Sequence, residues 1–476
     1  MVASIIKKNT GFLIVLVLLA FVVRALVFYG YLSHDQRYWQ VDSNTYHLTA
    51  QEIAQGHGIS KPNGQPQFYR VPGYSLFLAP YYALFGPDTK NVLWLQVLLA
   101  CFIPVLIFSM SLTLFPAHLL LAKASSLYSS VHLGLVLYSG FFMTETLFIF
   151  LFLLFAIFFF KAFRIFPRSR THVDTFFSKE LLTLFFSGIF LGAASLVRPV
   201  GHYLLVVSLL LLWCGCGSWL NKCAKNIALI CGWLASVSIW LLRNWLLTGY
   251  LFFHTLPGGH FLYLSAARVA MHVHETSYQE ARQILSREAQ ELMDQKEKEL
   301  GRPLQEIETC IVMERLSVKY FMKRPFSALK NWCTDMLRTT LSLYSAELLY
   351  LESGRQDIDY FAKGRGVWAM FCRYLVPQTD KFWLKVITYV EMFLFLFILI
   401  GFAGSLVVAL RGLIFEAHMQ LADALAKVLP FMLLFIVISL SGGYARMRLP
   451  CEPWLIITSW SFWLYFGKKF FNKELS

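Results

Sequence analysis

The chain alternates long apolar runs with short polar segments over most of its length, a pattern typical of helices that cross a membrane. The runs are long enough to span a bilayer as helices, and they lack the alternation of membrane β-strands. Backbone groups in lipid must be hydrogen-bonded internally, so helices are the expected spans. We therefore predict an all-α polytopic transmembrane bundle of about ten spans. The runs lie at residues 11–29, 91–115, 117–139, 141–163, 181–197, 199–216, 226–248, 385–410, 428–441 and 453–467.

The first apolar run follows a pair of lysines, as in a signal peptide, but no small-x-small cleavage site follows it. We interpret this run as an uncleaved first helix with a cytoplasmic N-terminus. Alternation then places the basic segments 161–179, 221–225 and 468–473 on the cytoplasmic side as well. Lysine and arginine are enriched in cytoplasmic loops, so these segments support the orientation.

Two long polar segments, residues 30–89 and 249–384, then face the other side, and both are too long to be simple turns. Apolar residues with interior Pro and Gly at 71–86 predict a short interfacial helix in the first segment. Balanced charges at helical spacing predict a solvated helical region in the second. We divide the chain into an N-terminal transmembrane catalytic module with its outer loop, an outer helical region and C-terminal transmembrane helices, at residues 1–250, 251–384 and 385–476.

Composition supports the membrane interpretation. The chain is 57% hydrophobic and 15% charged, with a mean hydropathy of +0.56, which excludes an ordinary water-soluble domain. Its net charge of +14 would suit nucleic acid, but the lysines and arginines are collected in short loops between apolar runs. We therefore expect no nucleic-acid partner.

Cysteine and histidine spacing gives little support for a metal site. The nine cysteines contain no C-x-x-C pair, and most are expected to be packing thiols. Cys310, Cys333 and Cys372 lie in the outer region, where an oxidising compartment would allow a disulfide whose pairing the sequence does not fix. The rings of His272 and His274 would point apart on a helix, and no third ligand is identifiable nearby, so a metal is not favoured.

Charges at the edge or in the interior of apolar runs are costly and therefore informative. We single out Arg70, Glu145, Arg198, Arg243 with Asn244, Glu391, Arg446, Arg448 and Glu452. Every member of this set except Glu391 maps near the outer end of a predicted helix. Each arginine alone is explained by snorkelling to lipid headgroups and pairing with nearby acids. Several arginines at one level instead suit a lipid phosphate, because guanidinium groups bind phosphate oxygens bidentately.

Asp42 opens a predicted helix directly after the first span, with Tyr46 and Ala50 following at helical spacing. Taken locally, the aspartate is better explained as a helix N-cap than as a catalytic group.

Five motifs follow one another along the chain. They are D-x-x-x-Y (Asp42, Tyr46) with G-x-G (Gly56, Gly58) and R-x-P-G-Y (Arg70 to Tyr74), T-E-T-L (Thr144 to Leu147), G-x-x-x-G-A-A-S-L-V-R-P (Gly188 to Pro199), R-N-W-L-L-T-G (Arg243 to Gly249) and A-R-M-R-L-P-C-E-P (Ala445 to Pro453). Together these motifs resemble the GT-C-fold membrane glycosyltransferases, in particular the bacterial aminoarabinose transferase and protein mannosyltransferase-like branch, and this resemblance favours a catalytic Asp42 over a helix cap. The match extends over nearly the whole chain. Two departures from the family pattern, Ser43 in place of a second acid and Ser75 in place of a proline, weaken what the resemblance implies about acceptor and metal.

The resemblance implies sugar transfer from a polyprenyl-phosphate donor to a cell-envelope lipid, protein or glycan on the non-cytoplasmic face, by an inverting single displacement. It assigns the activating base to Asp42. No cofactor is expected, and a divalent ion, if one is used, would take Asp42 as a ligand. The expected location is the bacterial inner membrane, with the site facing the periplasm or exterior. The implied donor-phosphate ligands are Arg70, Arg198, Arg243, Arg446 and Arg448, and the implied substrate-positioning residues are Tyr46, Tyr74 and Glu145, the last equally suited to a sugar hydroxyl or an arginine.

Two other classes of protein also fit a helical membrane chain. A transporter or lipid flippase would need charges near the bilayer midplane on broken helices, and only Glu391 fits that expectation. A scaffold or assembly factor would need no cluster of charges at all.

Overall fold

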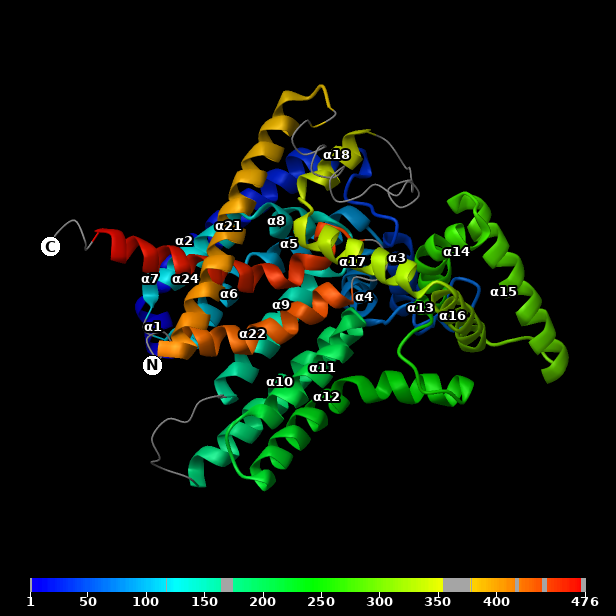
Figure 1. Cartoon of the computed structure of the whole chain (residues 1–476), viewed down its shortest axis with the longest axis horizontal. Coiled ribbons are helices and arrows are strands. Elements are labelled where there is room, and N and C mark those ends of the chain that lie inside the picture. The colour runs from blue at the N-terminus through cyan, green and yellow to red at the C-terminus, as the bar shows by residue number, and fades with distance from the viewer. Residues whose placement is uncertain are drawn as a thin grey trace.

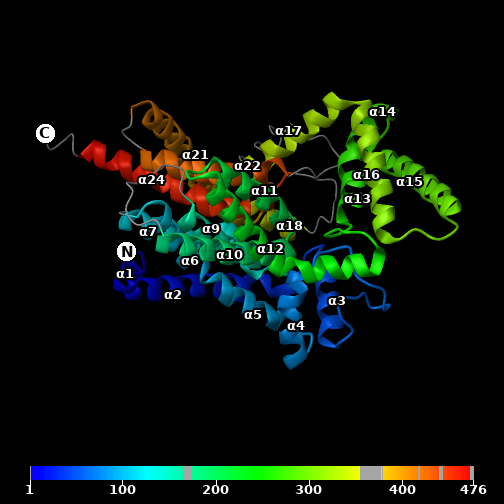
Figure 2. The ribbon, with the colours of Figure 1, turned by 90° about the horizontal axis from the view of Figure 1, so that it is seen from below.

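The computed structural model describes residues 2–116, 118–163, 174–353, 377, 379–415, 419–438 and 443–471. These residues form helices joined by loops, with one isolated β-bridge between Ser60 and Pro66, so the predicted all-α class is confirmed. Long helices form a bundle, and a smaller group, α13–α16, lies beyond one end of it in both ribbon views (Figures 1 and 2). Helix α1 and the end of α24 lie at the opposite end of the bundle.

The bundle contains the segments predicted to cross the membrane. Its helices are α1 (Val2–Lys8), α2 (Thr10–Val27), α5 (Thr89–Ala100), α6 (Ile103–Leu114), α7 (Leu119–Val131), α8 (Leu133–Gly140), α9 (Glu145–Ala162), α10 (Asp174–Val197), α11 (Val200–Cys214), α12 (Trp219–Thr248), α21 (Phe382–Phe415), α22 (Met419–Val437), α23 (Ala445–Arg448) and α24 (Glu452–Phe471). The first outer segment forms α3 (Ser43–Ala54) and α4 (Gly73–Phe85), so the helix predicted at residues 71–86 is present.

Within the described residues, each predicted apolar run contains helix, but fewer of these helices satisfy the length and composition of a full span. In the described residues seven segments satisfy them, or eight if α7 and α8, bent by 49° at their junction, form one span. Helix α11 has 15 residues, roughly 22 Å, which is less than the hydrocarbon thickness of about 30 Å. Helix α24 begins at a glutamate and contains serines and a threonine, which lower its hydropathy.

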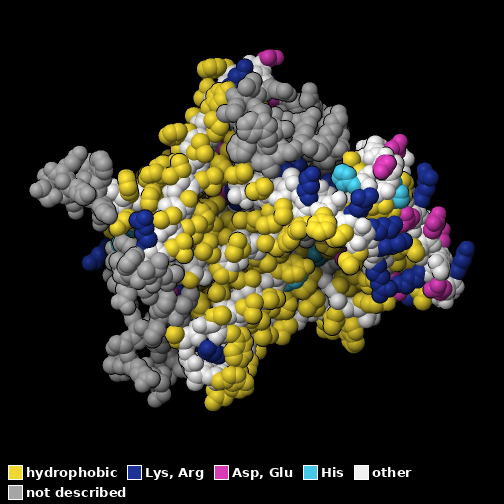
Figure 3. Space-filling model, in the orientation of Figure 1, with side chains coloured by type: hydrophobic (Ala, Val, Ile, Leu, Met, Phe, Trp, Pro, Cys, Tyr) yellow, Lys and Arg dark blue, Asp and Glu magenta, His cyan; other side chains and the backbone are white. Residues whose placement is uncertain are grey.

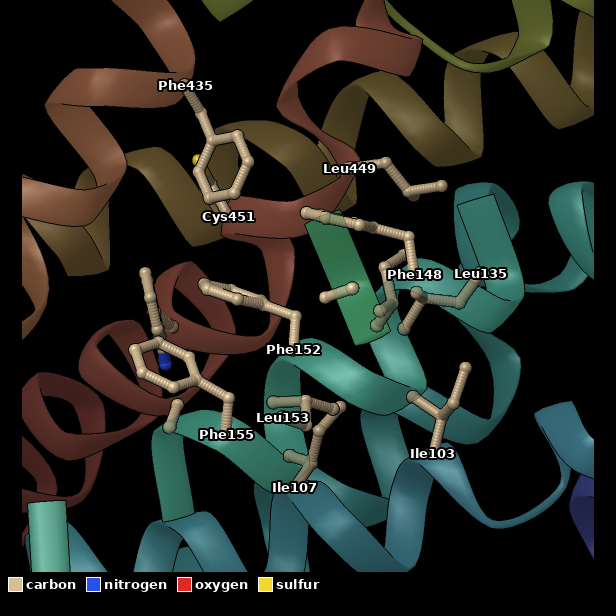
Figure 4. Packing of buried hydrophobic residues seen from close by; sticks show 14 of the residues in the cluster. Ile103, Ile107, Leu135, Phe148, Phe152, Leu153, Phe155, Phe435, Leu449 and Cys451 are labelled. Carbon is tan, nitrogen blue, oxygen red and sulfur yellow. The ribbon is translucent and has the colours of Figure 1, made fainter. Parts of the chain in front are cut away.

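Helix α9 is the centre of the bundle, and its aromatic side chains carry much of the core. Phe148, Phe152 and Phe155 follow one another along the helix, as Figure 4 shows. Phe152 packs edge-on against Phe435 of α22 and Trp454 of α24, with ring centroids 5.3 and 4.9 Å apart. This packing fixes the N-terminus of α9, where Glu145 lies, relative to the C-terminal helices.

Helices α10 and α12 pack backbone to backbone because glycines face each other at their contact. A Cβ atom on Gly232 would lie 1.9 Å from the carbonyl oxygen of Phe185, and one on Gly188 would lie 2.2 Å from that of Leu229. Small residues allow such close approach between membrane helices. The glycine that opens the G-x-x-x-G-A-A motif therefore has a packing role.

The outer helices have a hydrophobic core of their own, centred on residues such as Leu285 and Leu316. Charged side chains gather over this end of the molecule, while hydrophobic side chains cover the bundle (Figure 3). The first outer loop is joined to the group by an ion pair between Lys61 and Glu306, with nitrogen and oxygen 2.7 Å apart. The group consists of α13 (Leu256–His260), a π-helical turn Phe261–Ala266, α14 (Ala267–His274), α15 (Tyr278–Leu300) and α16 (Glu306–Lys323). Helices α17 (Pro325–Leu341) and α18 (Ser345–Ser353) continue the outer region.

The cysteine and histidine predictions concern this outer region. Cys310 is buried and Cys333 exposed, and both carry free thiols among the described residues, whereas Cys372 lies outside them. His274 shares a hydrogen bond with the hydroxyl of Tyr320 at 2.8 Å. Within the described part of the chain, no three His, Cys, Asp or Glu side chains gather closely enough to hold a metal ion.

Candidate functional site

Asp42 lies at the N-cap position of α3, but its carboxylate contacts two arginines. Arg70 donates from Nη2 to Oδ1 at 2.6 Å, and Arg446 donates from Nη1 and Nη2 to Oδ2, each at 3.2 Å. Within the described structure the carboxylate makes no capping bond to α3, and the backbone of Asp42 is already helical. Helix capping therefore does not explain this aspartate.

The R-x-P-G-Y turn holds Arg70 in place by packing onto the end of α10. A Cβ atom on Gly73 would lie 2.5 Å from the carbonyl oxygen of Leu196. Only a glycine permits this approach, so the motif locks the first outer loop against the segment that carries Arg198. Arg70 also donates to the hydroxyl of Tyr46 at 3.1 Å and lies over its ring, 5.0 Å from the centroid.

Glu145, the first residue of α9, is the second acid of the site. It accepts a hydrogen bond from Arg198 at 2.5 Å and another from Nε of Arg446. Arg446 thus bridges Asp42 and Glu145, which come from segments far apart in the sequence. Of the two predicted roles of Glu145, the pairing with arginine is observed. Its second oxygen, Oε2, is buried without a hydrogen-bond partner among the described residues.

The cluster carries more positive than negative charge. Three guanidinium groups, those of Arg70, Arg198 and Arg446, face the carboxylates of Asp42 and Glu145, which leaves an excess of one positive charge. Burial by itself would raise the pKa of Asp42, but the charges of Arg446 and Arg70 outweigh burial and lower the pKa below its usual value. Asp42 is therefore a carboxylate in this state.

Arg448 is separated from the cluster although it lies two residues from Arg446. Residues two apart on a helix are about 200° apart around its axis, so the two side chains of the one-turn α23 point to opposite sides. Arg448 donates to Glu452 at 2.7 Å and is buried. It also donates to the backbone carbonyls of Thr339, Thr340 and Ser342.

Two further predicted site residues make no hydrogen bond to the carboxylates among the described residues. Arg243 donates to the backbone carbonyls of Ile59 at 2.6 Å and Gln67 at 3.4 Å, so it holds the first outer loop. Tyr74 is fully buried, donates its hydroxyl to Gln96 at 2.8 Å and packs edge-on against Tyr46, with ring centroids 5.2 Å apart. Their contacts with the scaffold join the loop and α4 to the bundle.

Glu391, the charge that pointed toward a transporter, has a local explanation. Its two oxygens accept the backbone N–H groups of Tyr344 at 2.6 Å and Ser345 at 2.7 Å. A carboxylate at the first N–H groups of a helix satisfies otherwise unpaired donors. Glu391 therefore caps α18 and attaches it to α21.

The structure adds two ionisable side chains that the sequence did not single out. Glu347 of α18 accepts a hydrogen bond from Tyr138 at 3.0 Å, and burial raises its pKa against the opposing effects of that bond and of the Arg446 charge. His260, at the end of α13, has its pKa lowered by burial, while Asp42 acts in the opposite direction. In the sequence, both are isolated ionisable residues within the long second outer segment, and no motif or spacing distinguishes them.

No protein-family model and no curated protein matches the chain. Among solved structures it resembles the oligosaccharyltransferase AglB of the archaeon Archaeoglobus fulgidus, in complex with an inhibitory peptide and a dolichol-phosphate, with a TM-score of 0.54 at 12% identity. The match covers 99% of this chain and 52% of AglB, so the chain spans about half the length of that protein.

Two structures of ArnT from Cupriavidus metallidurans also match, at lower TM-scores. The form bound to undecaprenyl phosphate gives 0.39 at 13% identity over 93% of this chain and 78% of ArnT. The apo form gives 0.34 at 15% identity over 91% and 78%. At 12% identity, the likeness to AglB shows the fold alone. At the level of the fold, it confirms the resemblance that the motifs indicated: the chain has the GT-C membrane fold.

Proposed function

We propose that the protein transfers a sugar from a polyprenyl-phosphate donor to a cell-envelope acceptor, a lipid, protein or glycan, on the non-cytoplasmic face of the membrane. The observation that carries the proposal is the contact of Asp42 with Arg70 and Arg446 in a cluster that has one excess positive charge. The cluster lies where the ends of α9 and α10 meet the first outer loop. This position suits a lipid headgroup.

The charge of the cluster matches the charge of such a donor. A sugar linked to a polyprenyl phosphate is a phosphodiester with one negative charge, and the departing polyprenyl phosphate gains a second. Arg70, Arg198 and Arg446 would bind the phosphate oxygens and stabilise the charge that develops as the bond to the sugar breaks. Because the arginines now pair with Asp42 and Glu145, phosphate binding would redistribute these pairs.

This redistribution would prepare Asp42 to act as a base. The arginines hold the pKa of Asp42 low, so the carboxylate is a weak base in the resting cluster. When the donor phosphate takes over the guanidinium groups, the pKa of Asp42 rises and the carboxylate can accept the proton of an acceptor hydroxyl. The acceptor oxygen bonds to the anomeric carbon as the carbon–phosphate-oxygen bond breaks, and the electron pair leaves with the phosphate. A single displacement inverts the anomeric configuration.

The fold of AglB, whose solved structure is a complex with a dolichol-phosphate, is consistent with a lipid-phosphate substrate. We further propose that the reaction needs no divalent ion, because the guanidinium groups of the cluster supply the positive charge for the phosphate and occupy both oxygens of Asp42 in the resting state. The basic loops that we predict to be cytoplasmic support a site on the non-cytoplasmic face. We propose that the protein lies in the bacterial inner membrane with this site facing the periplasm or exterior.

The decisive experiment supplies the purified full-length chain in nanodiscs with a panel of labelled polyprenyl-phosphate hexoses and pentoses and with fractions of the cell envelope. We expect one donor to be cleaved, its sugar to appear on one fraction with inverted configuration, and chelation of divalent ions to leave the rate unchanged. If the lipid is moved between leaflets without cleavage, the protein is a flippase. If no donor is cleaved or moved, the proposal is wrong.

A further inference from the structure

Helix α17 turns its apolar side outward and its polar side inward. Its inner side carries Asp335 and Thr339, both fully buried, and Asp335 forms an ion pair with Arg268. The outer side is apolar at a spacing of three to four residues, and Phe326 on it is 86% exposed. A helix that faces water has the opposite arrangement. The exposed residues on the outer side are Phe326, Leu329, Cys333 and Leu337.

The stripe continues onto the preceding helix and is bordered by positive charge. On α16, Val318 and Met322 are exposed, the latter at 75%. Between Glu314 and Asp335 the chain has five basic residues and no acidic one, although the outer region as a whole is nearly balanced. The basic residues are Arg315, Lys319, Lys323, Arg324 and Lys330. An exposed apolar stripe with a basic border is typical of a surface that binds a membrane.

The depth of α17 is fixed by the bundle. The indole N–H of Trp332 donates to the carbonyl of Val437 at 2.9 Å, and Val437 is the last residue of α22, one of the apolar helices. In Figure 1 α17 crosses beside the end of α22, and in Figure 3 hydrophobic side chains extend from the bundle to this area. Helix α17 therefore lies at the level where the membrane helices end.

We infer that the outer side of α16 and α17 rests in the outer boundary of the bilayer, with the apolar stripe among lipid chains and the basic border against acidic phospholipid headgroups. A bilayer is the occupant that fits because the stripe is continuous with the lipid-facing bundle. A symmetric contact with a second copy would bring two basic borders together, which is unfavourable. The inference does not depend on the proposed function.

This contact has a consequence for the candidate site. Arg448 binds the carbonyls that end α17, and a Cβ atom on Gly443 would lie 2.4 Å from the carbonyl oxygen of Asp335. Helix α17 thus supports the short segment that carries Arg446. Lipid contact along α17 stabilises the position of Arg446 in the cluster.

The native Cys333 provides a direct test in the otherwise unchanged chain. We add one cysteine as an internal control, Gln295→Cys on the exposed side of α15, and place the protein in nanodiscs. A charged reagent is excluded from lipid, so Cys333 should react with a charged maleimide about tenfold or more slowly than the added thiol. A lipid-soluble maleimide should label Cys333 readily, as measured by mass spectrometry. Equal reactivity of both thiols toward the charged reagent would overturn the inference, and so would a short bifunctional maleimide that joins Cys333 of two copies.

A second experiment tests the headgroup. The variant Lys323→Glu with Arg324→Glu is compared with Lys296→Glu with Lys298→Glu on α15, which changes net charge equally. In nanodiscs of mixed phosphatidylcholine and phosphatidylglycerol, the lipid shell of the first variant should lose its enrichment in the acidic lipid, as measured by spin-labelled lipids, while the second keeps it. Equal loss in both variants would mean that overall charge, and not this surface, attracts the lipid.

Discussion

Arg446 and Arg448 lie two residues apart on one turn of helix, yet their surroundings differ in kind. Arg446 lies between Asp42 and Glu145, and each acid also has an arginine of its own. Arg448 is buried beside Glu452, and its Nη1 donates to the backbone carbonyls of Thr339, Thr340 and Ser342. The first surrounding has excess positive charge and pairs that can be exchanged. The second joins Arg448 to a buried acid and to backbone carbonyls, as expected of a residue that holds the fold together.

The strongest test of this contrast is the variant Asp42→Asn. The amide keeps the size of the carboxylate but cannot act as a base, so transfer from the donor should fall by roughly 10²- to 10⁴-fold. The measurement is product formation by purified protein in nanodiscs. Asp35→Asn in the same loop is the control, because Asp35 is 80% exposed and should leave the rate unchanged. If both variants remain active, Asp42 is not the base.

Replacing each arginine by alanine should separate the two surroundings. Arg448→Ala leaves Glu452 without its cation and should destabilise the fold by about 3–5 kcal/mol, a typical cost for breaking a buried pair. Arg446→Ala should abolish transfer with little effect on the unfolding temperature, since Asp42 keeps Arg70 and Glu145 keeps Arg198. Tryptophan fluorescence during heating and transfer assays would measure both effects. Loss of stability in Arg446→Ala alone would reverse the assignment.

A smaller effect should appear in the pH profile. Arg70 helps to lower the pKa of Asp42, so its pairing stabilises the carboxylate above the lowered pKa and is lost as pH falls through that value. Removing the charge in Arg70→Gln should raise the pKa of Asp42 and move the acidic limb of kcat/KM to higher pH. Arg37 lies in the same loop as Arg70 but pairs with Glu352 of α18. The variant Arg37→Gln should therefore leave the acidic limb in place. An unmoved limb in Arg70→Gln would show that another group controls it.

The helices could be predicted from the sequence because hydropathy acts locally. The acids and arginines of the cluster could also be identified, since charges at the ends of apolar runs are rare and costly. The sequence could not show which of these residues meet in the cluster and which support the fold. Only the knowledge that residues 445–448 form a single helical turn separates Arg446 from Arg448. Glu391 resembled a midplane charge because its partners, the N–H groups of Tyr344 and Ser345, are remote in the sequence.

In the outer region, the sequence could not show which side of α17 is exposed. Its balanced charges predicted a solvated surface, which fits the exposed charges of α15, but α17 within it has a buried Asp335 and an exposed Phe326. Amphipathic spacing is identical whichever side of a helix faces the core. The direction in which α17 faces follows from its packing on α22 and α23, which composition does not encode.

Arg243 offers the smallest and most discriminating prediction. The motifs assign it to the donor phosphate, whereas its guanidinium holds the carbonyls of Ile59 and Gln67 in the first outer loop. If it only supports the loop, Arg243→Gln should lower kcat/KM by roughly tenfold or less, the scale of one or two hydrogen bonds. Limited proteolysis should show faster cleavage of the loop, while the pH profile set by Asp42 stays unchanged. If Arg243→Gln instead abolishes transfer as completely as Arg446→Ala with the loop intact, then donor binding must bring Arg243 into the cluster, and the separation between supporting and reacting arginines would hold only for the resting state.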